Sequence, residues 1–356
     1  MKLTLIVPSQ RDYFIATAVL YCLCWLHGQL RTYFTNGIST ATIDMTSNGF
    51  VRVTIPTKTT WRAGQHYFLR FLTLGLHSWT SHPFTACSLP LQAHLYDAKT
   101  SELVFYIRPQ GGFTRRLASY LKSRPTFTTK VILDGPYGGV DMQRLAMPER
   151  LLFVAGGSGA GFLLPMIEAF LRRLNIEKLD VADKPDASPS STTARVILAT
   201  RDHATQAWFK HAVGELLARY AIDYPLHALE VDVHITGNDS PDSTFASSGR
   251  SSGEADDHEK GFHAGEAAAT TDGSNSSSEN VQLGRRASLS KSDGRPNLPT
   301  IVAEEAASDC HSLAIFACGP LSMQSDLSNA VAKQQLSIMK DGSKEIYLHM
   351  EHFSWA

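Results

Sequence analysis

The stretch Val154-Ala-Gly-Gly-Ser-Gly-Ala-Gly-Phe-Leu-Leu-Pro-Met166 decides the fold. It contains the end of the apolar run Leu151–Ala155, which predicts a buried strand, and it leads into a helical pattern over Phe162–Leu174. A glycine-rich turn between a buried strand and a helix is the context in which a dinucleotide pyrophosphate binds at a helix N-terminus. The spacing is not the usual GxGxxG, and Pro165 inside the first turns predicts a short or specialised helix start.

The alternation of strand and helix continues towards the C-terminus. Further strands are predicted over Arg195–Thr200, Leu229–Ile235 and Leu313–Ala317, and a helix over Ala204–Tyr220. Strands that alternate with helices form parallel sheets with helices on both faces. Residues 148–356 are therefore predicted to be a doubly wound α/β domain.

Residues 237–299 interrupt this domain between two strands. Ser, Gly, Asp, Glu and Ala dominate the segment, which has too few large apolar residues to offset the entropy of ordering. We expect a disordered surface insertion. It contains Arg285-Arg286-Ala287-Ser288, which resembles a basophilic-kinase site with Ser288 as acceptor; a chance match in a Ser-rich tract is the alternative.

Residues 35–147, upstream of the α/β domain, have the pattern of a small antiparallel barrel. Short alternating or apolar runs are bounded by Gly and Pro, and Asn48-Gly49 predicts a two-residue hairpin. Such runs at short spacing are typical of barrels. The predicted strands are Thr40–Thr46, Phe50–Ile55, His66–Leu72, Leu103–Arg108 and Lys130–Leu133.

The N-terminal residues 1–34 contain an uncharged apolar run, Tyr13–Leu26. A helix of that length spans about 21 Å, less than the ~30 Å hydrocarbon core of a bilayer. Three interpretations stay open: the remnant of a last membrane helix, an amphipathic or buried helix, and a signal peptide. Arg31 just after the run suits a cytoplasmic flank.

Composition excludes several classes of protein. The chain has 356 residues, enough for two domains, and a formal net charge of −1 with no basic stripe, which argues against a nucleic-acid partner. Its five cysteines have no metal-like spacing and argue against a disulfide framework. We expect no metal site, and cofactor domains that lie in the cytosol.

Five further motifs are each weak alone. His82-Pro-Phe-Thr-Ala-Cys-Ser88 is most often a packed strand, whereas Arg108 with Gly111-Gly-Phe-Thr114 could bind a diphosphate at the start of a helix or be an ordinary helix turn. Gly135-Pro-Tyr-Gly138 is a turn signal. Cys318-Gly-Pro320 places a thiol at the carboxyl edge of the sheet, where ligands bind, unless Cys318 is merely structural. The terminal Phe353 and Trp355 could pack in the core or cover a flat ring.

The order of these motifs is more specific than any one of them. HPFT, GGFT, GPYG, the glycine-rich turn, CGP and a terminal E-x-F together resemble the ferredoxin–NADP reductase superfamily. HPFT and the stretch Trp61–Phe71 resemble its ferric reductases and NADPH oxidases, and RTYFTNG, which begins at Arg31, resembles fungal ferric reductases. The resemblance covers roughly residues 12–236 and 300–356.

The resemblance implies FAD and NADPH as cofactors and a role for each matching residue. His82, Pro83, Phe84, Thr85 and Ser88 would lie at the flavin, and Arg108, Gly111, Gly112, Phe113 and Thr114 at its diphosphate. Gly156, Gly157, Ser158 and Gly159 would hold the NADPH pyrophosphate, with Gly135, Pro136, Tyr137 and Gly138 beside the nicotinamide. Cys318, Gly319 and Pro320 would position that ring, Phe353 would cover the flavin, and Arg201 would pair with a 2′-phosphate. Cys318 and Phe353 are the predicted catalytic residues.

The implied activity is electron transfer from NADPH through FAD to a ferric or cupric chelate. A superoxide-forming oxidase and a truncated, non-catalytic cofactor-binding product are the alternatives. The family also carries paired histidines for two haems on upstream membrane helices, and this sequence has no such pair. We therefore expect the FAD- and NADPH-binding half of such a protein, associated with a membrane through its N-terminal helix.

Overall fold

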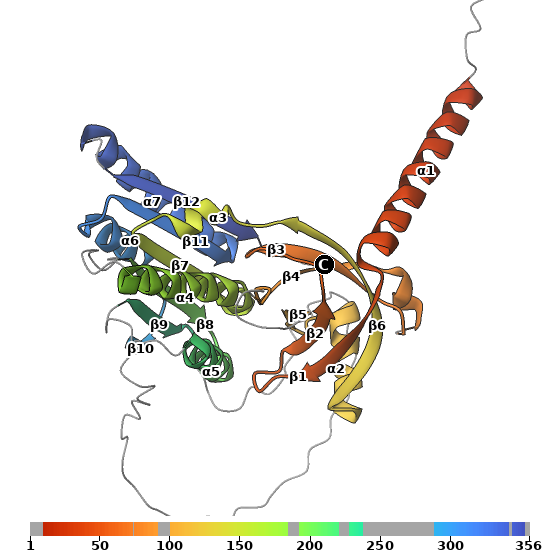
Figure 1. Ribbon diagram of the computed structural model, residues 1–356, viewed down its shortest axis with the longest axis horizontal. Helices are drawn as coiled ribbons and strands as arrows, with labels where there is room; N and C mark the ends of the chain where they lie inside the picture. Colours follow the sequence, from red (N-terminus) through yellow and green to blue (C-terminus); the bar gives the residue numbers. More distant parts are fainter. Residues whose placement is uncertain are drawn as a thin grey trace, which may run out of the picture.

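The computed structural model describes residues 10–73, 75–91, 100–183, 192–220, 228–237, 288–341 and 344–352. These residues form a long N-terminal helix and two six-stranded sheets, one antiparallel and one parallel (Figure 1). The predicted fold class is confirmed in both sheets.

The antiparallel sheet has the strand order β4-β3-β6-β1-β2-β5. It curls around an apolar core, and a backbone hydrogen bond of 2.8 Å from Cys87 N to Val104 O joins the chain after β4 to β5. Helix α2 (Gly112–Ser123) adds Phe113, Leu117 and Leu121 to this core. The strands are β1 (Ile38–Met45), β2 (Val51–Thr57), β3 (Gln65–Phe71), β4 (His82–Thr85), β5 (Ser101–Ile107) and β6 (Thr126–Gly138), with a short helix η1 (Gly75–Trp79) after β3.

Two local predictions in this sheet are wrong. The hairpin between β1 and β2 has a three-residue turn, Ser47–Gly49, because Thr46 N bonds to Phe50 O, and Gly49 takes a φ of +76°. This is a type of hairpin loop in which the glycine occupies the left-handed position. Strand β6 continues to Gly138, so Gly135-Pro-Tyr-Gly138 is strand rather than turn.

The parallel sheet has the order β10-β9-β8-β7-β11-β12. The chain starts at β7, moves outward to β10, and returns to pair β11 with β7. This reversal is the switch point at which open α/β sheets bind ligands beyond their carboxyl ends. The strands are β7 (Arg150–Gly156), β8 (Thr193–Thr200), β9 (Leu229–Ile235), β10 (Ser288–Asp293), β11 (Ser312–Gly319) and β12 (Glu345–His352).

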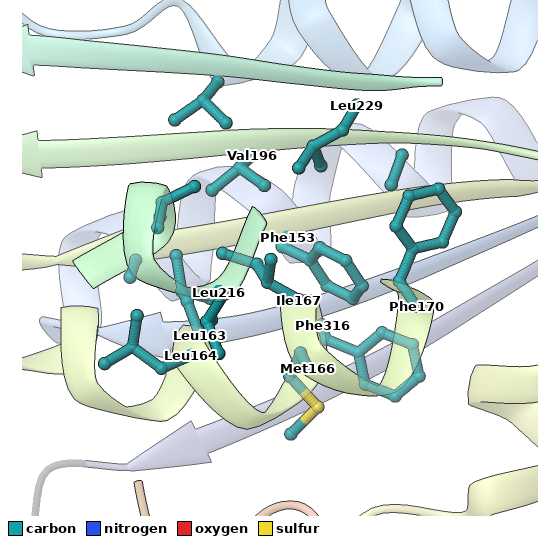
Figure 2. Close-up of a cluster of buried hydrophobic side chains, with 14 of the residues drawn as sticks. Phe153, Leu163, Leu164, Met166, Ile167, Phe170, Val196, Leu216, Leu229 and Phe316 are labelled. Atoms are coloured by element: carbon teal, nitrogen blue, oxygen red, sulfur yellow. The ribbon is translucent and has the colours of Figure 1, made fainter. Parts of the chain in front are cut away.

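Helices cover both faces of this sheet, as doubly wound folds require. Helices α4 (Ala160–Asp183) and α5 (His203–Tyr220) pack on one face, where Phe153 and Phe316 of the sheet meet Ile167 and Phe170 of α4 (Figure 2). Helices α6 (Leu298–Ala307) and α7 (Leu321–Asp341) pack on the other. Short helices η2 (Gly157–Gly159) and α3 (Met142–Ala146) complete the domain.

Two predictions in this domain need correction. Helix α4 has 24 residues although Pro165 lies inside it, so it is longer at both ends than the predicted Phe162–Leu174, and the helix η2 precedes it. Within the range 237–299, predicted as a disordered insertion, residues 288–299 form β10 and the start of α6. Residues 238–287 lie outside the described part of the chain.

Aromatic and polar contacts fix the two sheets relative to each other. Trp208 of α5 packs against Tyr106 of β5 and Phe50, with ring centroids 4.8 and 5.6 Å apart respectively. Leu89 N donates to the buried Glu168 carboxylate of α4. The clefts between the sheets are therefore bounded by fixed walls.

Helix α1 (Gln10–Asn36) projects away from both sheets (Figure 1). Its 27 residues span about 40 Å, so the prediction of a 21 Å helix is wrong. The window Gln10–Phe34 is long and apolar enough to cross a bilayer, by length and composition alone. None of the apolar window is buried against the rest of the described chain. The base of α1 is held by hydrogen bonds from Arg70 to Gln29 and from Asn36 to Leu133 O.

Candidate dinucleotide sites

Two cavities meet between the sheets. We call the one at the carboxyl edge of the parallel sheet, about 320 Å³, the edge cavity, and the one between the sheets, about 690 Å³, the central cavity. Arg108 and Ser158 line both of them. Two ligands bound in these cavities would therefore touch the same two residues.

The edge cavity begins at the predicted glycine-rich turn. Gly156, Gly157 and Ser158 line it, and Gly157 takes a φ of +54°. A Cβ on Gly156 would lie 2.8 Å from Pro320 Cδ, so only glycine lets the turns after β7 and β11 approach so closely. The turn forms η2, and Ala160 N at the start of α4 donates to Gly157 O and Ser158 O. The amides that suit a pyrophosphate are therefore those that precede Ala160.

The far end of the edge cavity carries two arginines, Arg201 after β8 and Arg295 before α6. No ion-pair partner is found for either among the residues that the structure describes. Asp202, which also lines the cavity, accepts a hydrogen bond of 2.6 Å from Thr205 N at the start of α5. Its carboxylate thus caps a helix, and the predicted cation Arg201 stands beside it.

The central cavity is lined by the predicted flavin segment and by the start of α2. His82, Pro83, Phe84 and Thr85 lie on one wall, and the His82 ring stacks on Phe113 with centroids 4.5 Å apart and planes 10° apart. Such a wall of rings and a flat strand suits an aromatic ligand.

The start of α2 supplies an anion-binding end to the same cavity. Gly111 is the N-cap and makes no side-chain cap hydrogen bond, and Gly112 takes a φ of +50°. The Thr114 hydroxyl donates to Gly111 O and accepts from Gln110 N, which holds the turn in shape. The helix dipole and the first amides of α2 then point at the space lined by Gly111–Thr114.

The floor of the central cavity joins both domains. Cys318 of β11 and Glu351 of β12 line it and are in register on neighbouring strands. Burial raises the pKa of the Cys318 thiol to about 12, so the group is a neutral thiol near pH 7. His349 Nε2 lies 3.0 Å from Glu351 Oε1 and orients that carboxylate.

Cys87 faces the same cavity from the barrel side. A Cβ on Gly161 would lie 2.8 Å from Cys87 Sγ, so the first turn of α4 packs closely against this thiol. Burial also raises the pKa of Cys87 to about 12. Sequence reasoning missed Arg295, and it assigned no role to Cys87 and Glu351 although both lie in quoted motifs, His82–Ser88 and the terminal E-x-F. Arg295 and Glu351 reach their cavities through the pairing of distant strands.

The structure places some predicted site residues elsewhere. The Ser88 hydroxyl donates to Glu102 O and accepts from Val104 N, so it ties the chain to β5 outside both cavities. Gly135, Pro136, Tyr137 and Gly138 lie on β6 beside β3 and line neither cavity. Phe353 and Trp355 lie outside the described residues. The other predicted residues, from His82–Thr85, Arg108, Gly111–Thr114, Gly156–Gly159, Arg201 and Cys318–Pro320, gather at the two cavities, with Gly319 just behind Pro320.

The residues present fit two dinucleotides. Each cavity joins a helix N-terminus that can receive a diphosphate, and Gly156 leaves a cradle that any side chain would fill. The central cavity adds a wall of rings, whereas the edge cavity adds two arginines that form no ion pair with any described residue. The first arrangement suits a flavin dinucleotide and the second a nicotinamide dinucleotide.

Comparison with known proteins agrees with this assignment. Residues 148–332 match the ferric reductase NAD binding domain, and residues 35–141 match an FAD-binding domain. A probable cell surface ferric reductase of Aspergillus oryzae is 30% identical over 219 residues, which are 56% of this chain and 26% of the relative. A ferric/cupric reductase transmembrane component of Candida albicans is 31% identical over 137 residues, 37% of this chain and 16% of that relative. The chain spans about a quarter or less of the length of these curated relatives.

Solved structures with a similar arrangement are more distant. A flavohemoglobin from Malassezia yamatoensis is 13% identical with a TM-score of 0.45, over 90% of this chain and 62% of that one. A ferredoxin–NADP+ reductase from Plasmodium falciparum is 9% identical with a TM-score of 0.44, over 88% of this chain and 96% of that one. Because the nucleotide-domain match alone covers more than half of the chain, this protein belongs to the ferric reductase family, of which it carries the FAD-binding and NAD-binding domains.

Proposed function

We propose that the chain passes electrons from NADPH through FAD to a ferric or cupric chelate. The observation that carries this proposal is the contact between the two cavities, which share Arg108 and Ser158. When bound, FAD supplies the redox chemistry by accepting a hydride from nicotinamide and releasing electrons singly. The protein's own residues bind, orient and shield the two rings.

Each part of the site has a role in this proposal. Gly156–Gly159 and the start of α4 hold the NADPH pyrophosphate, and Gly111–Thr114 with the start of α2 hold that of FAD. Cys318 packs as a neutral thiol at the point where the rings meet, and Phe353 covers the flavin when NADPH is absent. No side chain has to donate or accept a proton during hydride transfer. Gly135–Gly138 line neither cavity, so in this proposal they support β3 through strand pairing and do not contact the nicotinamide.

NADPH is proposed over NADH because of Arg201. A guanidinium at the end of β8 suits a 2′-phosphate, and the neighbouring Asp202 carboxylate is engaged in capping α5. If Arg201→Ala leaves the ratio of kcat/KM values for NADPH and NADH unchanged, Arg201 does not set this preference.

Membrane association through α1 is part of the same proposal. The helix presents exposed apolar side chains along its length, including Phe14 at 77% and Leu20 at 63% exposure. With α1 in the bilayer and Arg31 at its cytoplasmic end, the two domains would lie on the cytoplasmic side. Protease should leave both domains intact when it is added to sealed vesicles whose outer surface is the outer surface of the cell membrane. Cleavage within the barrel would contradict that orientation.

Ser288 is proposed as a target of a basophilic kinase. It is the first residue of β10 and pairs with Glu230 of β9, so the segment would have to leave the sheet edge to enter a kinase. A kinase assay on the full chain and on Ser288→Ala, read by mass spectrometry, tests this. Equal phosphate incorporation by the two proteins contradicts it.

The activity itself is tested on the full chain in detergent with FAD. NADPH should bleach the flavin absorbance under anaerobic conditions, and ferric citrate with a ferrous-specific chelator should restore it while coloured ferrous complex forms. Rapid reoxidation by oxygen alone, with superoxide detected and no metal reduction, would favour the oxidase alternative. Failure of NADPH to reduce bound flavin would favour the non-catalytic alternative.

A further inference from the structure

The chain between β9 and α6 touches the edge cavity at two points. Thr236, just after β9, and Arg295, just after β10, both line that cavity. Residues 238–287, between them, are not among the described residues. The chain leaves the sheet at its carboxyl edge after Ile235 and rejoins it at Ser288, opposite Glu230 at the start of β9. Strand β10 then runs along β9 and brings the chain back to the same cavity wall at Arg295.

The position of Arg295 is fixed by backbone contacts on both sides. Before it, β10 pairs in parallel with β9 from Ser288 to Asp293, and Gly294 N donates to Ile235 O at 2.9 Å with a φ of +94°. After it, the Asn297 side chain caps α6 by accepting from Thr300 N, and Leu298 is buried. Glycine at the turn lets the chain reverse, which carries Arg295 across the carboxyl edge of the sheet.

Arg295 and Arg201 together give the outer end of the edge cavity two cations. Both lack an ion-pair partner among the described residues, while Asp202 is occupied by its helix cap. Asp326 of α7 is the other carboxylate on the described wall and comes from the opposite side of the strand order. Arg108 stands at the inner end, where a Cβ on Gly157 would lie 3.7 Å from its Nη1.

The ligand expected at the outer end carries a charge close to that of two cations. A phosphate monoester has about −1.5 to −2 charges at pH 7 and strong acceptor oxygens, and arginine binds it in charge-assisted pairs. One guanidinium leaves such a group partly uncompensated. A dinucleotide that lacks this phosphate presents only ribose hydroxyls there.

We propose that Arg295 is the second cation for the 2′-phosphate of adenosine, acting with Arg201, so that the structured end of the long segment sets nucleotide choice. This inference rests on the proposed use of NADPH as electron donor. It assigns to the chain after residue 287 the second positive charge at the 2′-phosphate, which neither the glycine-rich turn nor the end of β8 supplies alone. It also means that any displacement of β10 from β9 removes a ligand-binding cation from the edge cavity.

The test compares adenosine 2′,5′-bisphosphate with 5′-AMP as probes of the full, FAD-loaded chain by calorimetry. Arg295→Ala should weaken binding of the bisphosphate about tenfold or more, whereas the affinity for 5′-AMP should stay within about twofold of wild type. Arg295→Lys should recover part of the loss. Arg124→Ala, at the far end of α2 and outside both cavities, is the matched loss of one exposed positive charge and should change neither affinity.

The salt dependence gives a second measurement. The bisphosphate affinity of the wild-type chain should fall more steeply with ionic strength than that of Arg295→Ala, because one fewer exposed charge pair is screened. If Arg295→Ala weakens the binding of both probes equally, or changes the binding of neither, the inference is overturned while NADPH use stands. A wild-type chain that does not distinguish the two probes overturns the proposed use of NADPH instead.

Discussion

The main-chain amide of Leu89 donates a hydrogen bond of 3.3 Å to the carboxylate of Glu168, across the boundary between the two sheets. Glu168 is 3% exposed and also accepts from Arg172 at 2.7 Å and from Tyr220 at 2.8 Å. One buried carboxylate thus joins the segment that follows the flavin wall to α4 and α5. Removal of the Glu168 charge should therefore affect both the stability of the chain and the binding of its flavin.

Glu168→Gln should lower the free energy of unfolding by ~3–5 kcal/mol, because Arg172 would be left buried without its counter-charge. Bound FAD should dissociate more readily, since Leu89 loses its charged acceptor. Urea unfolding and flavin fluorescence measure the two effects. Glu215→Gln is the control, with a side chain 67% exposed, and should stay within about 0.5 kcal/mol of wild type. Similar effects of the two substitutions would show that Glu168 does not hold the two sheets together.

Trp208→Ala should destabilise the chain by ~3–5 kcal/mol, because the 7%-exposed indole fills the space between α5, Tyr106 and Phe50. Flavin reduction by NADPH should also slow, since the two cavities then lose their fixed spacing. Thermal unfolding and stopped-flow absorbance are the measurements. Trp79→Ala also removes an indole, but one that is 83% exposed, and should leave stability and reduction rate nearly unchanged. A stable Trp208→Ala protein with normal reduction kinetics would contradict this account.

Alkaline pH should destabilise the chain partly through its buried thiols. Burial raises the pKa values of Cys87 and Cys318 from 9.0 to about 12, so the folded state keeps these protons after the unfolded state has lost them. The stability due to the neutral thiols is complete below pH 9 and is lost as pH rises towards 12. A Cys87→Ala, Cys318→Ala double variant should lose less stability between pH 8 and pH 10.5 in urea titrations than wild type does. The same slope in a Cys22→Ala control and in the double variant would refute the assignment.

Gly156→Ala should weaken NADPH binding about tenfold or more without lowering FAD content. The new Cβ would lie 2.8 Å from Pro320 Cδ, and overpacking at such a contact costs ~1–3 kcal/mol. Fluorescence titration with NADPH and the flavin absorbance of the purified chain measure these two quantities. Gly28→Ala in α1, where a Cβ would meet nothing within 4 Å, should change neither. Normal NADPH affinity in Gly156→Ala would show that this turn does not hold the pyrophosphate.

Local pattern was enough for much of the fold. Leu229–Ile235 was predicted as a strand with the observed bounds of β9, because a short β-branched, alternating run between polar segments has few alternatives. The strand and turn at Val154–Gly159 were likewise set by neighbouring residues. Helix α1 was underestimated because the apolar run ends at Leu26, whereas the helix continues through Gln29 and Asn36, whose side chains bond to the barrel.

The features that local sequence did not predict depend on contacts between segments far apart in the chain. Strand β10 has one large apolar residue, Leu289, and owes its pairing to the edge of β9. The composition of its surroundings therefore predicted disorder. Ser88 was assigned to the flavin by position in a motif, but its hydroxyl bonds to the backbone of β5. Arg295 carries no local signal, since only the order of strands brings it to its cavity.

Arg108 stands on the walls of both cavities, so a ligand in each would make the two binding equilibria interdependent. A single guanidinium cannot fully neutralise two diphosphates, so a ligand in one cavity draws on the charge available to the other. Thermodynamic reciprocity then requires that flavin alters nicotinamide affinity by the same factor as nicotinamide alters flavin affinity. Competition for one charge would make the sign negative, so that bound flavin weakens the equilibrium binding of the nucleotide beside it and the nucleotide weakens that of flavin.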